Sequence, residues 1–361
     1  MAKVRFPSRV GFNKTLKERV DQYFIENHKS KNGGWRMYIK TGVIIAWLVT
    51  AYLLLVFFSA SLIMAIISAF MVAQGFVLVG FNIQHDGNHG SYSKSRKVNR
   101  IMGFTLDLIG GSSLLWKQKH NILHHTYTNI NELDDDINSG GLLRFSPEQK
   151  WHPWHRFQHV YAFPFYSLMT LVWVGYNDFK RFFSGRMGDH KLPKPSSFEA
   201  TMFFLTKLFY VGYMLVLPMF FHPVLHVLLT FLGIHIVLGL TLAVVFQLAH
   251  IVEGNEFPTP LPETLDMENE WAIHEVETTA NFAPKSKFAA WYMGGLNFQI
   301  EHHLFAKVCH LHYPEISKIV AQTCEDFQVS YVSYPSFLSA LAAHVHFLKR
   351  LGRKPEIVAI S

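Results

Sequence analysis

Charged side chains are scarce in this sequence, and their scarcity is the first constraint on its fold. Asp, Glu, Lys and Arg make up 16% of the 361 residues, whereas apolar residues make up 50% and aromatic residues 15%. With a mean hydropathy of +0.14, this composition excludes an ordinary soluble globular domain and is typical of a membrane protein. We expect membrane lipids around the chain and no nucleic acid among its partners.

Cysteine is almost absent as well. Cys309 and Cys324 are the two cysteines of the chain. Two thiols exclude a disulfide framework, a thiolate metal cluster and iron bound through sulfur. Any metal ion must therefore be held by other side chains.

Signal and linker features are missing too. The first forty residues contain no leading apolar run, so we expect no cleaved signal peptide. No internal repeat, low-complexity tract or Gly/Ser linker divides the chain, and the proline-containing stretches 185–197 and 253–270 have the composition of ordinary connections. We therefore expect a single integral-membrane domain over residues 1–361.

Two long hydrophobic blocks predict the membrane spans. Thr41–Gln84 contains no Lys, Arg, Asp or Glu over more than twice the roughly 20 residues that a spanning helix needs. We expect the chain to fold back at the polar break Ser59–Ser61. Thr201–His250 behaves similarly, with a break at His222–Pro223 and one charge, Lys207, whose ammonium we expect to reach the membrane interface. The sequence predicts an all-α polytopic fold with four transmembrane helices in two hairpins.

Positive charge is distributed unevenly around these blocks. Apart from Lys207, every Lys and Arg lies in residues 1–40, in 90–199 or after 251. By the positive-inside rule we expect these segments, with both termini, on the cytoplasmic side. The net charge of +7 then faces an anionic lipid leaflet or an acidic protein partner, and a merely solvated basic face explains it equally well.

Two shorter apolar stretches need a separate interpretation. Ile101–Leu115 contains Asp107, Val160–Tyr176 contains Pro164, and both are shorter than a usual span. Short apolar runs are more often interfacial or buried helices than transmembrane ones, and we interpret both in that way.

Histidine is abundant where charge is scarce, and seven histidines fall into three compact clusters. The clusters are His85 with His89, His120 with His124 and His125, and His302 with His303, which follow Gln299. Imidazole suits zinc, copper, iron and nickel, and seven such ligands exceed the coordination of one tetrahedral or octahedral ion. The sequence therefore predicts a dinuclear metal site.

The two-hairpin topology places all three clusters on one membrane face. The first cluster follows the second span, the middle one lies between the hairpins, and the third lies beyond the fourth span. His85 and His89 share a helix face if the second span continues past the membrane surface, and His120 and His124 repeat that spacing. His250 ends the fourth span on the same face and is a further candidate.

The remaining histidines are assigned by their position. An isolated histidine on an apolar face is usually a hydrogen-bonded packing residue, and we expect His222, His226 and His235, toward the opposite membrane face, to be packing or interfacial residues. His152, His155 and His159 accompany Trp151 and Trp154, which suggests an amphipathic surface helix. The spacing of His274, His310 and His312 neither places them at the site nor excludes them.

Acidic residues beside the clusters are candidates for orienting the imidazoles, since a metal-bound imidazole needs its other ring nitrogen held by a carboxylate or carbonyl. These candidates are Asp86, Glu301 and the run 134–136; Asn88 is an amide that could serve in the same way or simply cap a turn. For the acidic run a solvated loop is an equal alternative. Trp116 and residues 291–298 stand close enough to the clusters to line a substrate tunnel.

At these residues the chain resembles the integral-membrane fatty acid desaturases, over essentially its whole length. The three-cluster arrangement, the sequence His-Asn-x-Leu-His-His-Thr-Tyr-Thr-Asn over 120–129 and Gln299 at the first position of the third cluster are similar to front-end acyl-lipid desaturases. Within that group it most resembles the compact delta-6 type of cyanobacteria and other bacteria, including the stretches Phe246–Glu253 and Trp271–Phe282.

The resemblance implies two iron ions and four spans under a cytoplasmic helical cap. It implies iron ligation by His85, His89, His120, His124, His125, His250, His302 and His303, and it makes Gln299 a cofactor-binding position. Many relatives have histidine there, so direct ligation, ligation through water and no ligation all remain open for Gln299.

The resemblance also implies the reaction: a cis double bond is introduced into a fatty acyl lipid or acyl-CoA, using dioxygen and two electrons. No His-Pro-Gly-Gly segment is present, so we expect no fused cytochrome b5 domain and a separate donor, ferredoxin or cytochrome b5.

Two other classes of protein are alternatives. The first is a di-iron membrane hydroxylase or alkane monooxygenase on the same scaffold, and Gln299 with the context 126–129 favours desaturation over it. The second is a metal transporter or heme electron carrier. A transporter places ligands near the bilayer midplane and a heme carrier pairs histidines across spans, whereas these clusters stand at helix ends and in loops.

Overall fold

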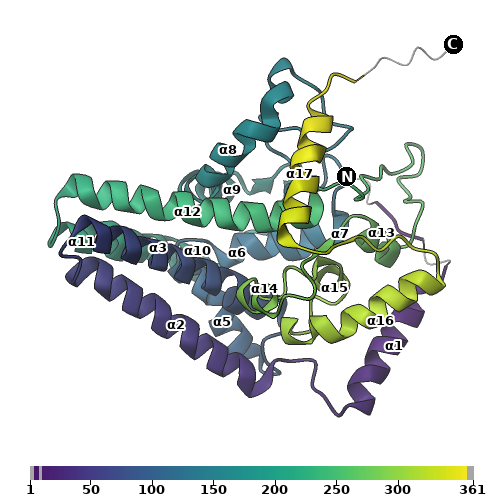
Figure 1. Cartoon of the computed structure of the whole chain (residues 1–361), viewed down its shortest axis with the longest axis horizontal. Helices are drawn as coiled ribbons and strands as arrows, with labels where there is room; N and C mark the ends of the chain where they lie inside the picture. Colours follow the sequence, from purple (N-terminus) through teal and green to yellow (C-terminus); the bar gives the residue numbers. More distant parts are fainter. Residues whose placement is uncertain (1–3, 8–9, 356–361) are drawn as a thin grey trace.

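The computed structural model of the chain describes residues 4–7 and 10–355, and most of these residues are helical (Figure 1). The α-helices are α1 (Phe12–Glu26), α2 (Gly34–Phe57), α3 (Leu62–Leu78), α4 (His85–His89), α5 (Arg96–Leu108), α6 (Ser113–Trp116), α7 (His125–Tyr127), α8 (Gln158–Val172), α9 (Asp178–Ser184), α10 (Ser197–Val211), α11 (Leu217–Met219), α12 (Val224–His250), α13 (Trp271–Glu277), α14 (Lys287–Tyr292), α15 (Gln299–Leu304), α16 (Tyr313–Asp326) and α17 (Phe337–Leu351).

Shorter elements connect or extend these helices. Wider π-helical segments are η1 (Val79–Gln84), η2 (Lys117–His124), η4 (Trp173–Asn177) and η5 (Gly212–Val216), and 3-10 turns are η3 (Pro153–Phe157) and η6 (His310–His312). The strands β1 (Arg186–Met187) and β2 (His190–Lys191) pair antiparallel, with Arg186 opposite Lys191. The strands β3 (Asn281–Phe282) and β4 (Ser333–Tyr334) pair parallel, with Asn281 opposite Ser333.

Four helices in the described residues are long and apolar enough to cross a membrane, as the sequence predicts. They are Gly34–Phe57, Leu62–His89, Ser197–Met219 and Val224–His250. The first two are separated where Ser61 caps α3 by accepting a hydrogen bond from the Met64 N–H, and the last two where Pro223 precedes α12. The predicted breaks at Ser59–Ser61 and His222–Pro223 are confirmed.

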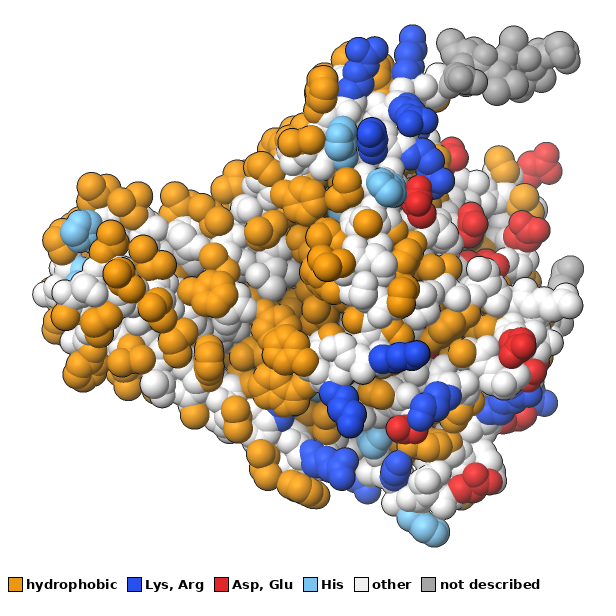
Figure 2. All heavy atoms as spheres, viewed as in Figure 1, with side chains coloured by type: hydrophobic (Ala, Val, Ile, Leu, Met, Phe, Trp, Pro, Cys, Tyr) orange, Lys and Arg blue, Asp and Glu red, His pale blue; other side chains and the backbone are white. Residues whose placement is uncertain are grey.

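The spans extend to one side of the molecule, and the remaining helices gather at the other (Figure 1). Hydrophobic side chains cover the visible surface of the spans, whereas Lys, Arg, Asp and Glu concentrate at the opposite end (Figure 2). Ile63 and Leu225, for example, are 70% and 64% exposed. Such an apolar surface is stable when lipid surrounds it, so this is an integral membrane protein.

The second span continues beyond α3 through η1 into α4, which confirms that His85 and His89 stand on its extension. The wider turns of a π segment change the pattern of backbone hydrogen bonds within the helix. Two side-chain amides donate to backbone carbonyl oxygens there: Asn82 Nδ2 to Leu78 O at 3.0 Å and Gln84 Nε2 to Gly80 O at 2.8 Å. The π segment therefore lies directly before the first histidine cluster.

The two shorter apolar stretches are not among the candidate spans of the described chain. Ile101–Leu115 forms most of α5 and part of α6, and α5 packs on α4 and η1. Val160–Tyr176 belongs to α8 and η4, and α8 packs along α12. Both pack against the helices that carry histidines.

The expectation for Lys207 is wrong. Its side chain does not reach the interface, because the ammonium is buried and donates to Asp178 Oδ2 at 2.7 Å, Gly110 O at 2.6 Å and Val174 O at 3.1 Å. A carboxylate and two carbonyls supply the partners that snorkelling would otherwise seek.

Two of the histidines outside the clusters have the surroundings of packing residues, and one contradicts its predicted role. His235 bonds Thr170 and Tyr210, and His222 bonds the Val56 carbonyl, as packing residues do. His155 contradicts the amphipathic surface helix, because it is buried in the turn η3, where Nδ1 accepts from His152 N–H and Nε2 donates to Gly141 O.

Candidate metal centre

The three histidine clusters and His250 meet at the end of the spans. His85 and His89 come from α4, the middle cluster from η2 and α7, His250 from the last residue of α12, and the third cluster from α15. Seven of these eight histidines are buried, and His89 is half-buried. The convergence that the topology predicts is therefore present in the structure.

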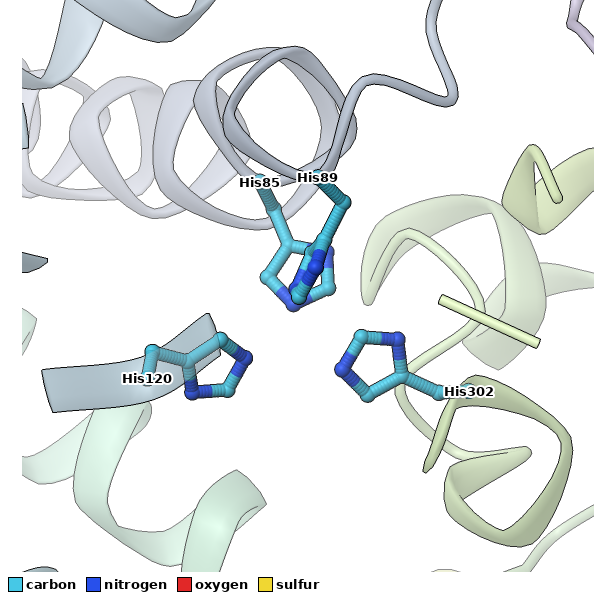
Figure 3. Close-up of side chains that lie close together, drawn as sticks. All are labelled: His85, His89, His120 and His302. Atoms are coloured by element: carbon cyan, nitrogen blue, oxygen red, sulfur yellow. The ribbon is translucent and has the colours of Figure 1, made fainter. Parts of the chain in front are cut away.

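One group consists of His85, His89, His120 and His302, each of which offers a ring nitrogen within 4.8 Å of the others. Figure 3 shows the four rings directed toward a common centre from three separate segments. The ring centroids of His85 and His302 are 4.5 Å apart, and those of His89 and His120 are 5.1 Å apart.

A second group consists of His124, His250 and His303, again within 4.8 Å. Their ring centroids are separated by 4.7 to 5.0 Å. His125 lies between the groups, because its ring is 4.7 Å from that of His302 and 4.3 Å from that of His303. The eight imidazoles therefore divide into two adjacent nitrogen-rich groups.

The ring nitrogens are suited to metal ions. In the described part of the chain, several buried ring nitrogens have no hydrogen-bond partner: both nitrogens of His85, Nε2 of His89 and His302, and Nδ1 of His125 and His250. A buried polar atom without a partner costs about 1–3 kcal/mol, and a coordinated ion removes that cost. Burial also lowers the pKa of His120, His125, His302 and His303 well below its ordinary value, with help from neighbouring imidazoles. These rings are thus neutral, which is the form that binds metals.

Acidic and hydroxyl groups orient three of the imidazoles. His124 Nδ1 lies 3.1 Å from Asp134 Oδ2, His303 Nδ1 lies 2.6 Å from Glu275 Oε2, and His302 Nδ1 lies 3.3 Å from the Tyr313 hydroxyl. With Nδ1 fixed in this way, Nε2 faces the other imidazoles, as metal-binding histidines require. Asp134 belongs to the predicted acidic run, so that expectation is confirmed.

Sequence reasoning missed Glu275 and Tyr313. Glu275 is 28 residues from His303, and Tyr313 is 11 residues from His302. Sequence spacing therefore indicates neither contact. The one available signal was that Glu275 lies within Trp271–Phe282, a stretch that carries the resemblance to the delta-6 desaturases.

The expectation that Glu301 orients a ligand is wrong. Its carboxylate accepts from Asn281 Nδ2 at 2.8 Å and from the Tyr331 hydroxyl at 2.9 Å, and among the residues that the structure describes it bonds no imidazole. Burial raises the pKa of Glu301 to about 7, despite these two donors. Asn88 likewise bonds Gln84 and the Gly103 carbonyl and thereby fastens α4 to α5.

His124 differs electrostatically from the other imidazoles. Burial alone would lower its pKa, but the charges of Asp134 and Asp136 outweigh burial and raise the pKa to about 9. Asp136 Oδ2 lies 3.4 Å from His124 Nδ1. The two carboxylates therefore place negative charge next to the second group.

Gln299 stands at the second group. Its Nε2 lies 3.0 Å from His250 Nε2 and 3.4 Å from His303 Nε2, and its buried Oε1 has no hydrogen-bond partner in residues 4–7 and 10–355. Gln299, His302 and His303 all lie on the helix α15.

The undecided histidines have different surroundings. His310 reaches the edge of the site, where Nδ1 donates to Asp86 Oδ2 at 2.9 Å. His274 packs against Phe6, and His312 packs against Phe24.

A narrow apolar cavity of about 40 Å³ adjoins the first group. Its walls come from α3, η1, α5, α8, η4 and α12, and they include His85 and Trp116. The indole of Trp116 stacks on the His120 ring with centroids 4.4 Å apart. Trp116 is therefore confirmed beside both the cavity and the histidines, whereas residues 291–298 contribute nothing to its wall.

Comparison with known proteins agrees with this geometry. The sequence model of the family "Fatty acid desaturase" matches residues 60–335. The chain is 39% identical over 360 residues to sn-1 linoleoyl-lipid 6-desaturase from Arthrospira platensis, covering 99% of this chain and 97% of the relative. It is 36% identical to a protein of the same name from a Synechocystis species, covering 97% and 98%.

A third relative is named for a different double-bond position. The acyl-lipid (8-3)-desaturase of Physcomitrium patens is 40% identical over 347 residues, which cover 94% of this chain and 72% of the relative. With the family match over most of the chain, these likenesses agree with four spans and a histidine-lined centre. The chain belongs to the fatty acid desaturase family, and it is a membrane oxidoreductase with front-end desaturase function.

Proposed function

We propose that this enzyme introduces a cis double bond at the delta-6 position of acyl chains carried by membrane lipids. The observation that carries the proposal is the likeness to two linoleoyl-lipid 6-desaturases over 97% or more of both chains. A carrier lipid, rather than acyl-CoA, is the substrate class named for these relatives.

We place two iron ions in the two histidine groups. His85, His89, His120 and His302 would hold one ion, His124, His250 and His303 the other, and His125 lies between them. When bound, iron would supply the activation of dioxygen that protein side chains cannot provide, and in the overall reaction dioxygen, two electrons and two protons take two hydrogens from adjacent methylenes and leave two waters.

The residues of the chain have three tasks around this centre. Asp134, Glu275 and Tyr313 hold imidazoles with Nε2 directed inward. The apolar walls beside His85 and Trp116 line the approach to the first group and exclude water from the methylenes that reach it. The polar groups thus fix the metal ligands while the apolar groups fix which methylenes lie next to them.

In this proposal Gln299 lies next to the second ion. Its amide lies within 3.4 Å of both His250 Nε2 and His303 Nε2. Rotation of the amide by half a turn would present the unpartnered Oε1 to the position that these nitrogens share.

We further propose that residues 1–361 act as one domain, with the histidine groups and both termini on the cytoplasmic side. The cytoplasmic assignment follows from the Lys and Arg pattern. Electrons come from a separate acidic protein, ferredoxin or cytochrome b5, which suits a net charge of +7.

Feeding a host that expresses the chain tests the function. The host receives saturated, mono- and diunsaturated fatty acids, and mass spectrometry locates the new double bonds in each lipid class. We expect a delta-6 double bond in lipid-bound linoleoyl chains and none in cells that express His303→Ala. A hydroxylated product would instead assign the chain to the membrane hydroxylases.

A further inference from the structure

A buried lysine lies behind the first histidine group and has no place in the function described so far. Lys40 lies in α2, two turns from the start of the first span, and its side chain is 5% exposed. Within the described residues its hydrogen-bonding partner is His310 Nε2 at 2.9 Å. An ammonium removed from water with so few partners is costly, so its position calls for an explanation.

The ammonium fixes the tautomer of His310. An ammonium can only donate, so Nε2 of His310 must accept and Nδ1 must carry the hydrogen. That hydrogen is donated to Asp86 Oδ2 at 2.9 Å, and the backbone N–H of His310 lies 3.4 Å from the same oxygen. Lys40 therefore orders His310, and His310 orders Asp86.

Asp86 connects this chain of contacts to the metal centre. Its other oxygen, Oδ1, lies 3.8 Å from His85 Nδ1. Among the described residues, no other acidic oxygen lies within 4.0 Å of His85. Each oriented imidazole in the second group has its own carboxylate, and for His85 the corresponding carboxylate is Asp86.

Charge balance assigns Lys40 its role. Asp86 is 1% exposed, and a carboxylate in such surroundings needs a cation or several donors to stay ionised and in place. His310 alone is neutral while it donates to Asp86 and accepts from Lys40, so the positive charge comes from Lys40. The Trp291 ring, 5.3 Å from Nζ, gives the ammonium a second favourable contact.

We propose that Lys40 is a positioning residue for the first metal ion, acting through His310 and Asp86 on His85. The proposal rests on the proposed metal function, because it concerns how one ligand of that centre is held. It also assigns a function to Asp86 and His310 that ligation does not require: they transmit the charge of Lys40 to the imidazole.

Cobalt binding tests the proposal without relying on activity. Full-length protein is purified in detergent, stripped of metal and titrated with Co²⁺, whose visible absorption reports each equivalent bound. We expect Lys40→Met to weaken one of two equivalents by about tenfold, the usual loss when a group behind a ligand is removed, and to leave the other unchanged.

A double variant separates charge transmission from packing. If Lys40 acts through Asp86, then Lys40→Met lowers cobalt affinity no further in an Asp86→Asn background. Additive losses, or equal weakening of both equivalents, would overturn the proposal. So would unchanged binding by folded Lys40→Met protein.

Two further measurements keep the test decisive. If Lys40→Met does not fold, His310→Asn, which breaks the same connection but keeps the ammonium, must weaken the same single equivalent, and unchanged binding refutes the idea. Absence of cobalt binding by the parent protein would count against the proposed metal centre itself, so the two failures are distinguishable.

Discussion

Glu275 offers the sharpest test of how the second histidine group is built. Its carboxylate is fully buried, lies 2.6 Å from His303 Nδ1 and accepts from the Thr128 hydroxyl at 3.0 Å. Glu275→Gln keeps the volume and replaces the carboxyl group that holds His303 Nδ1 with an amide. Loss of such a group behind a metal ligand lowers metal affinity about 10- to 100-fold, which corresponds to about 1.4–2.7 kcal/mol.

The assay measures metal retention. Purified parent and variant proteins are dialysed against a chelator series, and elemental analysis gives iron per chain at each step. We expect Glu275→Gln to lose about half of its iron at a chelator strength that leaves the parent intact, and to lose desaturation in parallel.

Glu301→Gln is the matched control. It is an equally buried glutamate next to His302 in sequence, but its carboxylate bonds Asn281 and Tyr331. We expect it to retain iron like the parent. Equal iron loss in both variants, or none in Glu275→Gln, would refute the assignment of Glu275 as the partner of His303.

Three further predictions concern the site and its scaffold. His303→Ala should abolish unsaturated product and reduce iron content; parental product in lipid analysis would disprove ligation. Lys207→Met strands the buried Asp178 carboxylate and should cost about 3–5 kcal/mol, seen as a lower thermal midpoint in detergent, and an unchanged midpoint would contradict the pair. Gly294→Ala forces a Cβ onto the Phe81 carbonyl at positive φ and should prevent folding or metal retention, whereas Gly233→Ala, with open space around it, should be tolerated; equal behaviour of the two would refute the steric argument.

The spans could be predicted from the sequence because their signals are local. An uncharged stretch longer than two spans and a serine at 61 that caps the next helix are both readable without knowing the fold. The clusters were also readable, since four-residue spacing places His85 and His89 on one helix face. The convergence of the three clusters followed from the two-hairpin topology, which places all of them on one membrane face.

The partners of these residues could not be predicted, because tertiary contacts choose them. Lys207 meets Asp178 across 29 residues, and His303 meets Glu275 across 28. Sequence adjacency misled in the case of Glu301: neighbouring residues on a helix point about 100° apart, so a carboxylate beside His302 faces away from the imidazole's partners. The helix and strand propensities of single residues carry no information about such tertiary contacts.

Anomalous diffraction at the iron absorption edge, from crystals of the purified enzyme, tests the central claim most directly. We predict two peaks, one enclosed by His85, His89, His120 and His302 and one by His124, His250 and His303. A single peak, no peak, or a peak away from these imidazoles would contradict it.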